Sequence, residues 1–291
     1  MDHLSLYTAF LGKRYKLKAP LRVIFDASDG TTGPVLKKLN AGRAKVHATY
    51  LNAVPDGRFP AHGPNPMKDG ALGGLERAVK SAGADLGVAF DGDGDRVFFV
   101  DNRGLFVNSD HVAFLLRQSF RPPYLIDVRG GRLLRTKDAV ITKVGHYYIK
   151  KMMRKLGASF GAEQSGHYYF KDFFNCDSGI FAAIAVMNAV SELKSRGSSL
   201  SLWTDALPAY FRIPETNFKV ADKEGAVRRV AAVYKRSARA VYRLDGLSMD
   251  FKDFWFNIRA SNTEPLLRLN LEAGNKKILA AKLKEISALI V

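Results

Sequence analysis

The sequence lacks the features of several protein classes. Cys176 is the single cysteine among 291 residues, so no disulfide can form within the chain. No apolar run reaches the ~18 residues that a membrane-spanning helix needs. The N-terminal residues contain no basic region followed by an apolar core, so no secretory signal peptide is expected. These absences favour a cytoplasmic protein in a reducing compartment, with no membrane partner.

Acidic residues are also few. The chain has 45 Lys and Arg against 28 Asp and Glu, a net charge of +17. Nucleic-acid binding, anionic small molecules and a generally basic proteome would each explain this excess. The basic residues form only short clusters, such as Lys150-Lys151 and Arg228-Arg229, without the long blocks or interleaved aromatics of nucleic-acid binders. A nucleic-acid partner is therefore disfavoured, and attraction of anionic sugar phosphates would follow from the same charge.

Three aspartates stand out between two short apolar segments. Asp91, Asp93 and Asp95 lie between Leu86–Phe90 and Val97–Val100, and both segments have the length and composition of strands. Carboxylates so close together repel each other unless a cation lies among them. The intervening glycines allow a tight bend, and carboxylate oxygens suit a hard ion such as Mg²⁺ or Ca²⁺.

An EF-hand does not explain this acidic segment. The sixth position of such a loop requires Gly and the twelfth requires Glu, whereas this chain has Arg96 and Asn102 there. A solvated acidic turn without a functional role remains the alternative interpretation. Arg96 favours the functional reading, because a cation beside a metal site is what a phosphate ester needs.

Periodicity divides the chain into four segments. Residues 1–19 predict one amphipathic helix that ends before Pro20 and has no core of its own. Residues 20–106 read as strand, helix, strand, loop, helix, strand, loop and strand. Residues 107–207 repeat this α/β logic, and residues 208–291 form a small α+β domain. Within the last two segments, strands are expected at 124–128, 139–144, 159–162, 168–170, 211–220, 247–251, 254–258 and 266–271, and helices at 107–120, 146–156, 180–193 (capped by Asp177), 221–237 and 276–290.

The first α/β segment contains two loops of interest. A strand at Leu21–Phe25 leads into a loop with Gly30 and Gly33, which could cradle phosphate but matches neither common nucleotide-binding pattern. Helix packing alone would explain both glycines. Residues 55–66 contain four prolines and predict a rigid loop without regular structure.

Two polar turns and one cationic segment complete the candidate sites. Glu163-Gln-Ser-Gly-His167 places groups that suit sugar hydroxyls in five residues, although such a turn can also satisfy its own polar atoms. Arg259-Ala-Ser-Asn-Thr-Glu-Pro265 offers a forked charge and hydroxyls for a phosphate, or forms a simple hairpin turn. Lys143 and His146 lie at a predicted helix start, where an anion is favoured; a surface histidine is the alternative.

These motifs together carry a resemblance. Asp-Gly-Asp-Gly-Asp-Arg at 91–96, Glu-Gln-Ser-Gly-His at 163–167 and Arg-Ala-Ser-Asn-Thr-Glu-Pro at 259–265 occur in the order seen in the α-D-phosphohexomutases. Pro-Asp-Gly-Arg-Phe-Pro at 55–60 and Asp-Ser-Gly-Ile at 177–180 also fit. The resemblance covers about residues 20–291. It implies two tandem mixed-sheet α/β domains, II (20–106) and III (107–207), and a C-terminal α+β domain IV (208–291) like the TATA-box-binding protein.

The resemblance also implies roles for individual residues. The aspartates of the first motif would hold Mg²⁺, with Arg96 and His167 as catalytic groups. The second motif, with Lys143 and His146, would bind the sugar, and the third motif would bind the phosphate of the substrate. The implied metal ligands are Asp91, Asp93 and Asp95, and the implied substrate-binding residues are Lys143, His146, Glu163, Ser165, His167, Arg259, Ser261, Asn262 and Thr263.

One family motif has no counterpart among these residues. The family's first domain carries a phosphoserine in a loop of the Thr-Ala-Ser-His-Asn-Pro kind, and no serine here is followed by histidine. Residues 1–19 resemble only the helix that joins the first two domains. The expectation is therefore a phosphohexomutase that is inactive alone or depends on a separately encoded phosphoserine domain. The alternative is a non-catalytic phosphosugar-binding protein.

The resemblance implies a hexose 1-phosphate and 6-phosphate as substrates and a hexose 1,6-bisphosphate as activator or intermediate. Gln164 is compatible with glucosamine-type enzymes as well as with mannose and glucose enzymes, and Phe-Asn-Cys-Asp-Ser-Gly at 174–179 favours mannose or glucose.

Overall fold

The computed structural model describes residues 2–261 and 264–291. Backbone contacts divide the chain into two units. The N-terminal unit contains the residues up to Tyr124 together with Met153–Leu207, and the C-terminal unit contains Leu125–Met152 and Pro208–Val291. No helix among the described residues is long and apolar enough to cross a membrane. The four domain boundaries expected from the sequence remain a prediction.

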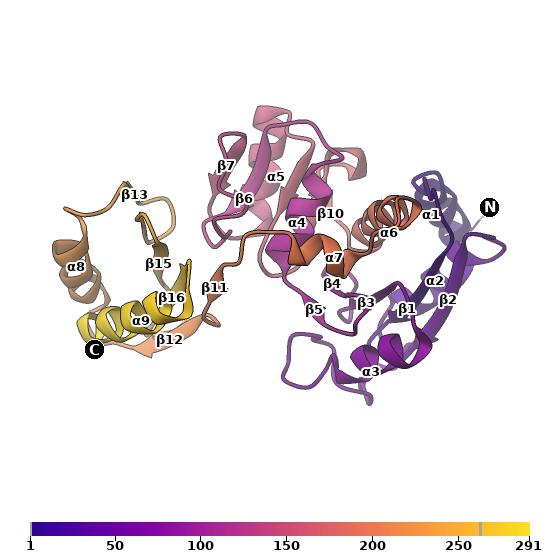
Figure 1. Cartoon of the computed structure of the whole chain (residues 1–291), viewed down its shortest axis with the longest axis horizontal. Helices are drawn as coiled ribbons and strands as arrows, with labels where there is room; N and C mark the ends of the chain where they lie inside the picture. The colour runs from indigo at the N-terminus through magenta and orange to yellow at the C-terminus, as the bar shows by residue number, and fades with distance from the viewer. Residues whose placement is uncertain (1, 262–263) are drawn as a thin grey trace. The chain divides into compact units, whose positions relative to one another are not determined.

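The N-terminal unit is built on a mixed five-stranded sheet in the order β2-β1-β3-β4-β5 (Figure 1). β1 pairs in parallel with β2 and β3, whereas β3–β4 and β4–β5 pair antiparallel. The strands of this sheet are β1 (Leu21–Asp26), β2 (Val46–Leu51), β3 (Leu86–Phe90), β4 (Val97–Val100) and β5 (Phe106–Val107), and the helices before α4 are α1 (His3–Gly12), α2 (Thr32–Asn40) and α3 (Gly73–Ala82).

The remaining elements of this unit surround a second strand group. β8, β9 and β10 pair antiparallel in sequence order. They are β8 (Phe160–Ala162), β9 (Tyr168–Phe170) and β10 (Cys176–Asp177), accompanied by α4 (Ser109–Arg117), a 3₁₀ turn at Lys171–Phe173, α6 (Gly179–Ser195) and α7 (Leu200–Asp205). α6 is mainly apolar up to Val190, and it packs on α4 as well as on β3 and β4.

Both faces of the first sheet are covered, which explains why β3 and β4 are buried along their whole length. Ile24 and Ala89 face α3, whose Leu75 and Val79 lie against them. Phe90 points to the opposite face, where the start of α6 approaches its ring. The carboxyl ends of β1, β2 and β3 therefore share one edge of a well-buried sheet.

The C-terminal unit is built on a six-stranded antiparallel sheet. Its path is β11-β16-β15-β14-β13, and β12 also pairs with β16. The strands are β11 (Phe211–Arg212), β12 (Thr216–Lys219), β13 (Ala240–Tyr242), β14 (Leu247–Asp250), β15 (Phe254–Ala260) and β16 (Leu266–Ala273), with helices α8 (Lys223–Tyr234) and α9 (Lys276–Ile290). Figure 1 shows α9 next to β16, and α8 packs on α9; the sheet and the two helices enclose an apolar core of residues such as Phe256, Leu269 and Ile286.

The central segment of this unit contributes two neighbouring strands, β6 (Tyr124–Asp127) and β7 (Ala139–Thr142), followed by α5 (His146–Leu156). Arg132 ties this segment to the antiparallel sheet. Its backbone N–H donates to Glu272 at 2.8 Å, and its guanidinium donates to Asp250 and to the Phe254 carbonyl, both at 2.8 Å. Mixed sheets and a C-terminal sheet domain, as expected from the resemblance, are confirmed.

Two expectations about elements need correction, and the expected end of the N-terminal helix before Pro20 is confirmed. Asp177 does not cap the long apolar helix, because it belongs to β10; Ser178 is the cap and accepts from the Phe181 N–H at 3.2 Å. The N-terminal helix ends at Gly12, well before Pro20. The strand expected at 211–220 is interrupted between β11 and β12 at residues 213–215, because Pro214 has no N–H to donate to a ladder.

Candidate functional site

The acidic loop, residues 91–96, is held in place through its backbone by the loops that follow β1 and β2. The Gly92 carbonyl accepts from the Thr31 N–H at 3.0 Å, and the Gly92 N–H donates to the Pro64 carbonyl at 3.0 Å. Gly30 permits this approach, because a Cβ there would lie 2.3 Å from the Gly92 oxygen. The glycine therefore serves loop-to-loop contact and not the helix packing that the sequence suggested.

The proline-rich loop is anchored by a buried carboxylate. Asp26 ends β1 and accepts from Asn52 at 3.0 Å, and its other oxygen lies 3.2 Å from His62 Nε2. Residues 55–66 contain neither helix nor strand, which confirms the expected loop without regular structure. The Asp26–His62 contact fixes this loop, and Pro64 in turn supports the acidic loop.

Asp91 and Arg96 form a half-buried ion pair inside the acidic loop. Arg96 Nε donates to Asp91 Oδ2 at 2.6 Å, and the backbone N–H groups of Gly94 and Arg96 both donate to Oδ1 at 3.1 Å. Burial raises the pKa of Asp91 above its usual value, and the Arg96 guanidinium partly offsets this effect. Arg96 therefore stabilises the charged form of a carboxylate that is 3% exposed.

The three aspartates fit a hard cation. One oxygen from each of Asp91, Asp93 and Asp95 lies within 4.8 Å of the other two, and their exposure rises from buried Asp91 to exposed Asp93. Carboxylate oxygens on a loop with two glycines are the donor set that Mg²⁺ prefers, with water free to complete its shell on the exposed side. The residues present thus match the predicted metal.

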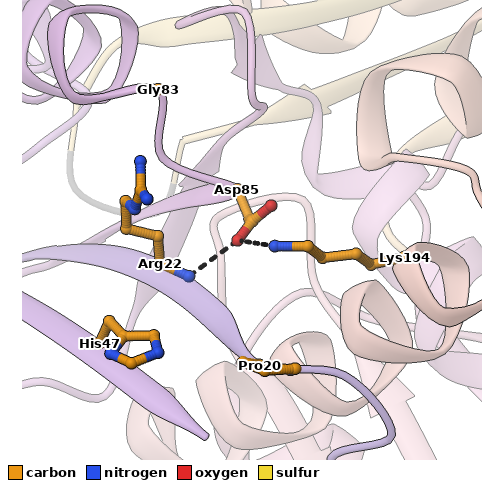
Figure 2. A pocket seen from close by; sticks show the side chains of 6 residues that line it. All are labelled: Pro20, Arg22, His47, Gly83, Asp85 and Lys194. Carbon is orange, nitrogen blue, oxygen red and sulfur yellow. Dashed lines mark hydrogen bonds and ion pairs between the residues drawn. The ribbon is translucent and has the colours of Figure 1, made fainter.

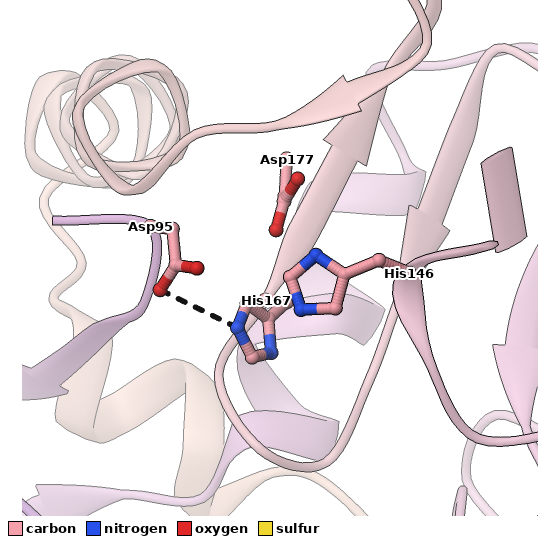
Figure 3. A group of neighbouring side chains, drawn as sticks. All are labelled: Asp95, His146, His167 and Asp177. Carbon is pink, nitrogen blue, oxygen red and sulfur yellow. Dashed lines mark ion pairs between the residues drawn. The ribbon is translucent and has the colours of Figure 1, made fainter. Parts of the chain in front are cut away.

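The sugar loop, Glu163–His167, lies beside the acidic loop in the same unit. Arg96 and His167 form a backbone bridge, and the Val97 N–H donates to the Gly166 carbonyl at 3.1 Å. His167 Nε2 lies 3.4 Å from Asp95 Oδ1, and its Nδ1 lies 3.0 Å from the Ser165 hydroxyl. Figure 3 shows the Asp95–His167 contact, with Asp177 close by.

Polar partners hold the sugar loop rigid. Glu163 is 3% exposed, and its Oε2 accepts from the Tyr169 hydroxyl at 2.7 Å and lies 3.5 Å from His167 Nδ1. The turn therefore satisfies part of its own polarity, as the alternative reading of this sequence supposes. Asp95, His167 and Asp177 also each place a ligand atom within 4.8 Å of the others, so the edge of the acidic loop is rich in carboxylate and imidazole.

A separate pocket of about 340 Å³ lies at the opposite edge of the first sheet (Figure 2). Asp85 at its centre accepts from the Arg22 N–H at 2.7 Å and from Lys194 Nζ at 2.8 Å. Arg22 stands at the start of β1 and Asp85 just before β3, whereas Lys194 comes from the last turn of α6. In parallel sheets ligands bind at the carboxyl ends of strands, so this pocket is not the predicted site.

In the C-terminal unit, the phosphate loop (residues 259–265) connects β15 and β16. Arg259 is the last residue but one of β15 and is opposed by Arg268 of β16. Both guanidinium groups face Glu215: Arg259 Nη2 lies 3.4 Å from Oε2, and Arg268 Nη1 lies 3.5 Å from Oε1. Asn262 and Thr263, predicted to bind phosphate, lie outside the described residues. Ser261 is buried, and its hydroxyl accepts from the Glu264 N–H at 3.3 Å.

Glu215 is ionised within this cationic group. Burial alone would raise the pKa of Glu215, but the Asn270 amide and the guanidinium groups of Arg259, Arg129 and Arg268 together hold it below its usual value. The carboxylate also accepts from Asn270 Nδ2 at 3.0 Å. Three arginines and one glutamate therefore share the polar side of the β15–β16 hairpin.

Lys143 and His146, also predicted to bind substrate, stand at the start of α5 in the C-terminal unit. Lys143 Nζ lies 5.5 Å from the centre of the Tyr148 ring, and His146 is the first residue of the helix. The Val144 N–H between them donates to Asp245 at 3.1 Å. This segment is thus fixed to the turn that precedes β14.

Known proteins match nearly the whole chain. Models of the phosphoglucomutase/phosphomannomutase family match residues 5–104 (alpha/beta/alpha domain II), 134–210 (alpha/beta/alpha domain III) and 215–289 (C-terminal domain). The chain belongs to the phosphoglucomutase/phosphomannomutase family. The three matches follow one another in the order of the acidic, sugar and phosphate loops, so each loop falls within one family domain.

Named relatives agree with this family. The chain is 38% identical over 287 residues to a phosphomannomutase of Salmonella typhimurium, an alignment that covers 93% of this chain and 62% of that protein. It is 36% identical to a phosphomannomutase of Escherichia coli, covering 100% of this chain and 66% of that protein. The chain therefore spans a little under two thirds of the length of these family members.

Solved structures share the fold of this chain. A phosphoglucomutase/phosphomannomutase family protein from Burkholderia thailandensis superposes with a TM-score of 0.87 at 27% identity, covering 99% of this chain and 64% of that one. An N-acetylphosphoglucosamine mutase from Aspergillus fumigatus, solved with GlcNAc-6P and magnesium, gives a TM-score of 0.63 at 13% identity, covering 99% of this chain and 68% of that one.

Several residues that were not predicted from the sequence lie among the candidate site residues of this chain. Glu215 and Arg268 are brought to Arg259 by strand register, and Lys223 Nζ lies 3.4 Å from the carbonyls of Ser261 and Glu264. Tyr169 orients Glu163. Only Tyr169 carried a sequence signal, because it follows His167 at the alternate position of a strand.

Proposed function

We propose that the chain supplies the metal, sugar and phosphate loops of a phosphohexomutase, which interconverts hexose 1-phosphate and hexose 6-phosphate with mannose or glucose as the sugar. Mg²⁺ is the proposed cofactor and a hexose 1,6-bisphosphate the proposed intermediate. The observation that carries the proposal is the contact of the acidic and sugar loops within one unit, where Arg96 and His167 form a backbone bridge. An ester oxygen and a sugar hydroxyl of one substrate can be reached from that junction.

The side chains suggest distinct tasks in this reaction. When bound by Asp91, Asp93 and Asp95, Mg²⁺ would neutralise developing charge on a transferring phosphoryl group. Arg96 donates from Nε to Asp91 and from Nη1 to Asn65 at 3.4 Å, and Nη2 would donate to the substrate phosphate. His167 Nε2 lies 3.4 Å from Asp95 Oδ1, and from this position the imidazole would exchange a proton with a sugar hydroxyl.

The proposed phosphoryl donor lies on a segment other than these 291 residues, since none of their serines is followed by histidine as in the donor loop that the resemblance implies. A donor loop on the same or on a separate polypeptide is therefore the proposed partner. Positioning and charge stabilisation account for most of the rate of phosphoryl transfer, yet both need a donor on which to act.

The test is a mutase assay on the purified chain with Mg²⁺, mannose 1-phosphate and catalytic glucose 1,6-bisphosphate. It is run with and without a phosphoserine-bearing first domain from a relative. Activity that requires the added domain is expected. Replacement of Asp93 by Asn should abolish that activity, whereas Asp69→Asn, a change of an exposed aspartate outside the loop, should not alter it.

Two other outcomes would change the proposal. Activity without the added domain would show that another residue of this chain carries the phosphoryl group. Phosphosugar binding without activity under either condition would favour the alternative, a non-catalytic phosphosugar-binding protein.

A further inference from the structure

The sheet of the C-terminal unit has one polar face in the region of the phosphate loop. Register places Trp255 opposite Glu272, Asn257 opposite Asn270 and Arg259 opposite Arg268. Residues directly opposed in an antiparallel pair project to the same side, as do residues two apart along a strand. The alternate positions, such as Phe256 and Leu269, belong to the apolar core. The polar face thus ends in two arginines that lie side by side at the base of the phosphate loop.

Side-by-side arginines repel each other, and Glu215 compensates that repulsion. Pro214 interrupts the edge strand just before Glu215, and Thr216 resumes pairing with Leu269 of β16. The carboxylate consequently reaches over the polar face. It is 27% exposed, so it is neither sealed in the core nor free in solvent. It is positioned where an anion could also approach Arg259 and Arg268 from outside.

Glu215 satisfies these arginines only in part. The two nitrogen–oxygen distances, 3.4 and 3.5 Å, exceed the 2.7–2.9 Å that charge-assisted hydrogen bonds usually show. Nε of Arg259 and Nε of Arg268 are both buried, and neither has a hydrogen-bond partner among the residues that the structure describes. Leaving a buried donor of this kind without a hydrogen bond costs free energy. A phosphate monoester, which has three terminal oxygens, offers more acceptors than one carboxylate.

We propose that Glu215 is a counter-anion built into the phosphate clamp. Its carboxylate keeps Arg259 and Arg268 together while no ligand is bound, and it competes with a phosphate monoester for the same guanidinium donors. Glu215 is accordingly a positioning residue that weakens phosphate binding. The inference rests on the proposed function, because it assumes that the loop at 259–265 grips a substrate phosphate.

A weakened clamp suits a mutase. In the proposed reaction the bisphosphorylated sugar must leave the phosphate loop, turn and present its other phosphate to the same loop. A clamp of two arginines without a resident anion would hold either phosphate tightly and slow this exchange. Glu215 offers the arginines an alternative partner at the moment when phosphate departs, which lowers the barrier to release.

The test compares phosphate binding by the wild-type chain and by Glu215→Gln. Glutamine keeps the size and the Asn270 contact but removes the charge. Dissociation constants for inorganic phosphate and for glucose 6-phosphate are measured by calorimetry at constant pH and ionic strength. Glu215→Gln is expected to bind both ligands about tenfold more tightly, since one opposing charge has been removed from the site. Glu215→Asp should restore weaker binding.

The matched control is Glu224→Gln, which removes the same charge from exposed α8 in the same unit. It should leave both dissociation constants within twofold of the wild-type values. A thermal-unfolding series with increasing phosphate provides a second readout. Without phosphate, Glu215→Gln should unfold at a lower temperature than the wild type, since no carboxylate then separates the two arginine charges. Added phosphate should raise the unfolding temperature of Glu215→Gln by more than that of the wild type.

The possible results separate the inference from the proposed function. Weaker or unchanged phosphate binding by Glu215→Gln, with Arg259→Ala still abolishing binding, would overturn the counter-anion role and leave the phosphate loop intact. Wild-type binding that Arg259→Ala does not change would instead show that this loop is not the phosphate site. In that case the proposed function and the inference would both fail.

Discussion

At the scale of single residues, the acidic loop shows how one sequence pattern serves two purposes. Asp91 is the buried member, and it is largely engaged by Arg96 and by two backbone N–H groups. Asp93 is exposed, and Asp95 faces both the loop and His167. We therefore expect Asp91 to shape the loop, while Asp93 and Asp95 contribute more freely to a cation.

The aspartates should accordingly differ on substitution. Asp93→Asn is expected to weaken Mg²⁺ binding by about tenfold or more while changing the free energy of unfolding by less than about 0.5 kcal/mol, because surface changes usually cost little. Asp91→Asn should weaken Mg²⁺ binding and also destabilise the fold by about 1–3 kcal/mol, because Arg96 would lose its partner. Calorimetric Mg²⁺ titration and urea denaturation measure the two effects. Equal destabilisation by both changes would contradict this division of roles.

Glu215 gives a pH dependence with a defined sign. Its folded-state pKa lies below its usual value, so the unfolded chain binds the proton more tightly. The stabilisation is therefore present above the ordinary pKa of about 4.3 and is lost as pH falls through the folded-state pKa. The stability difference between the wild type and Glu215→Gln should be largest near neutral pH and shrink below about pH 4.3. Urea denaturation across that range measures it, and a difference that grows in acid would refute the assignment.

At the scale of elements, local chemistry decides where helices and strands end. The apolar run after Asp177 predicts a helix, but the run does not identify its cap. Ser178 has an extended backbone and accepts from the Phe181 N–H, whereas Asp177 pairs in β10 with Tyr169. Asp and Ser are both common helix N-caps, so the sequence alone does not choose between Asp177 and Ser178. Asp177 is paired in a strand, and Ser178 therefore caps the helix.

The cap can be tested directly. Ser178→Ala should destabilise the N-terminal unit by about 1 kcal/mol, since the Phe181 N–H is buried and would lose its partner. Ser195→Ala, in the exposed last turn of the same helix, is the matched control and should change stability by a few tenths of a kcal/mol. Comparable losses from the two changes would argue against the assigned cap.

Loop contact makes a second element-scale prediction. Gly30→Ala would bring a Cβ within 2.3 Å of the Gly92 carbonyl oxygen, so the acidic loop must shift. A loss of about 1–3 kcal/mol in stability is expected, together with weaker Mg²⁺ binding. Gly57→Ala, in a loop of the same unit with no neighbour within 4 Å of the added atom, should change neither property. Unaltered Mg²⁺ affinity in Gly30→Ala would show that the loop tolerates the shift.

At the scale of the whole molecule, the net charge of +17 favours anionic ligands. Much of that charge is exposed and therefore screened by salt. The dissociation constant for glucose 6-phosphate should rise several-fold between about 50 and 500 mM NaCl, because the Debye length falls from roughly 14 to roughly 4 Å. Binding of neutral glucose should be insensitive to salt. Tight binding of a DNA oligonucleotide at low salt, with a much steeper salt dependence, would instead support the hypothesis that the protein binds nucleic acid.

The sequence by itself determined the order of elements and the location of three loops. Strands at 86–90, 97–100 and 168–170 and the helix at 276–290 have the predicted bounds, because hydrophobic periodicity and glycine or proline boundaries are local signals. The same local signals placed the acidic, sugar and phosphate motifs between strands. The family assignment followed from their order.

Only the tertiary structure decided which side chains meet. Glu215 reaches Arg259 and Arg268 from 44 and 53 residues away, and Arg96 meets the backbone of His167 across 71 residues of sequence. The pairing of β15 with β16 and the approach of loops at one sheet edge create these contacts. The spacing of residues along the sequence does not predict these contacts. The register between strands is set by the burial of one whole sheet face and not by neighbouring residues.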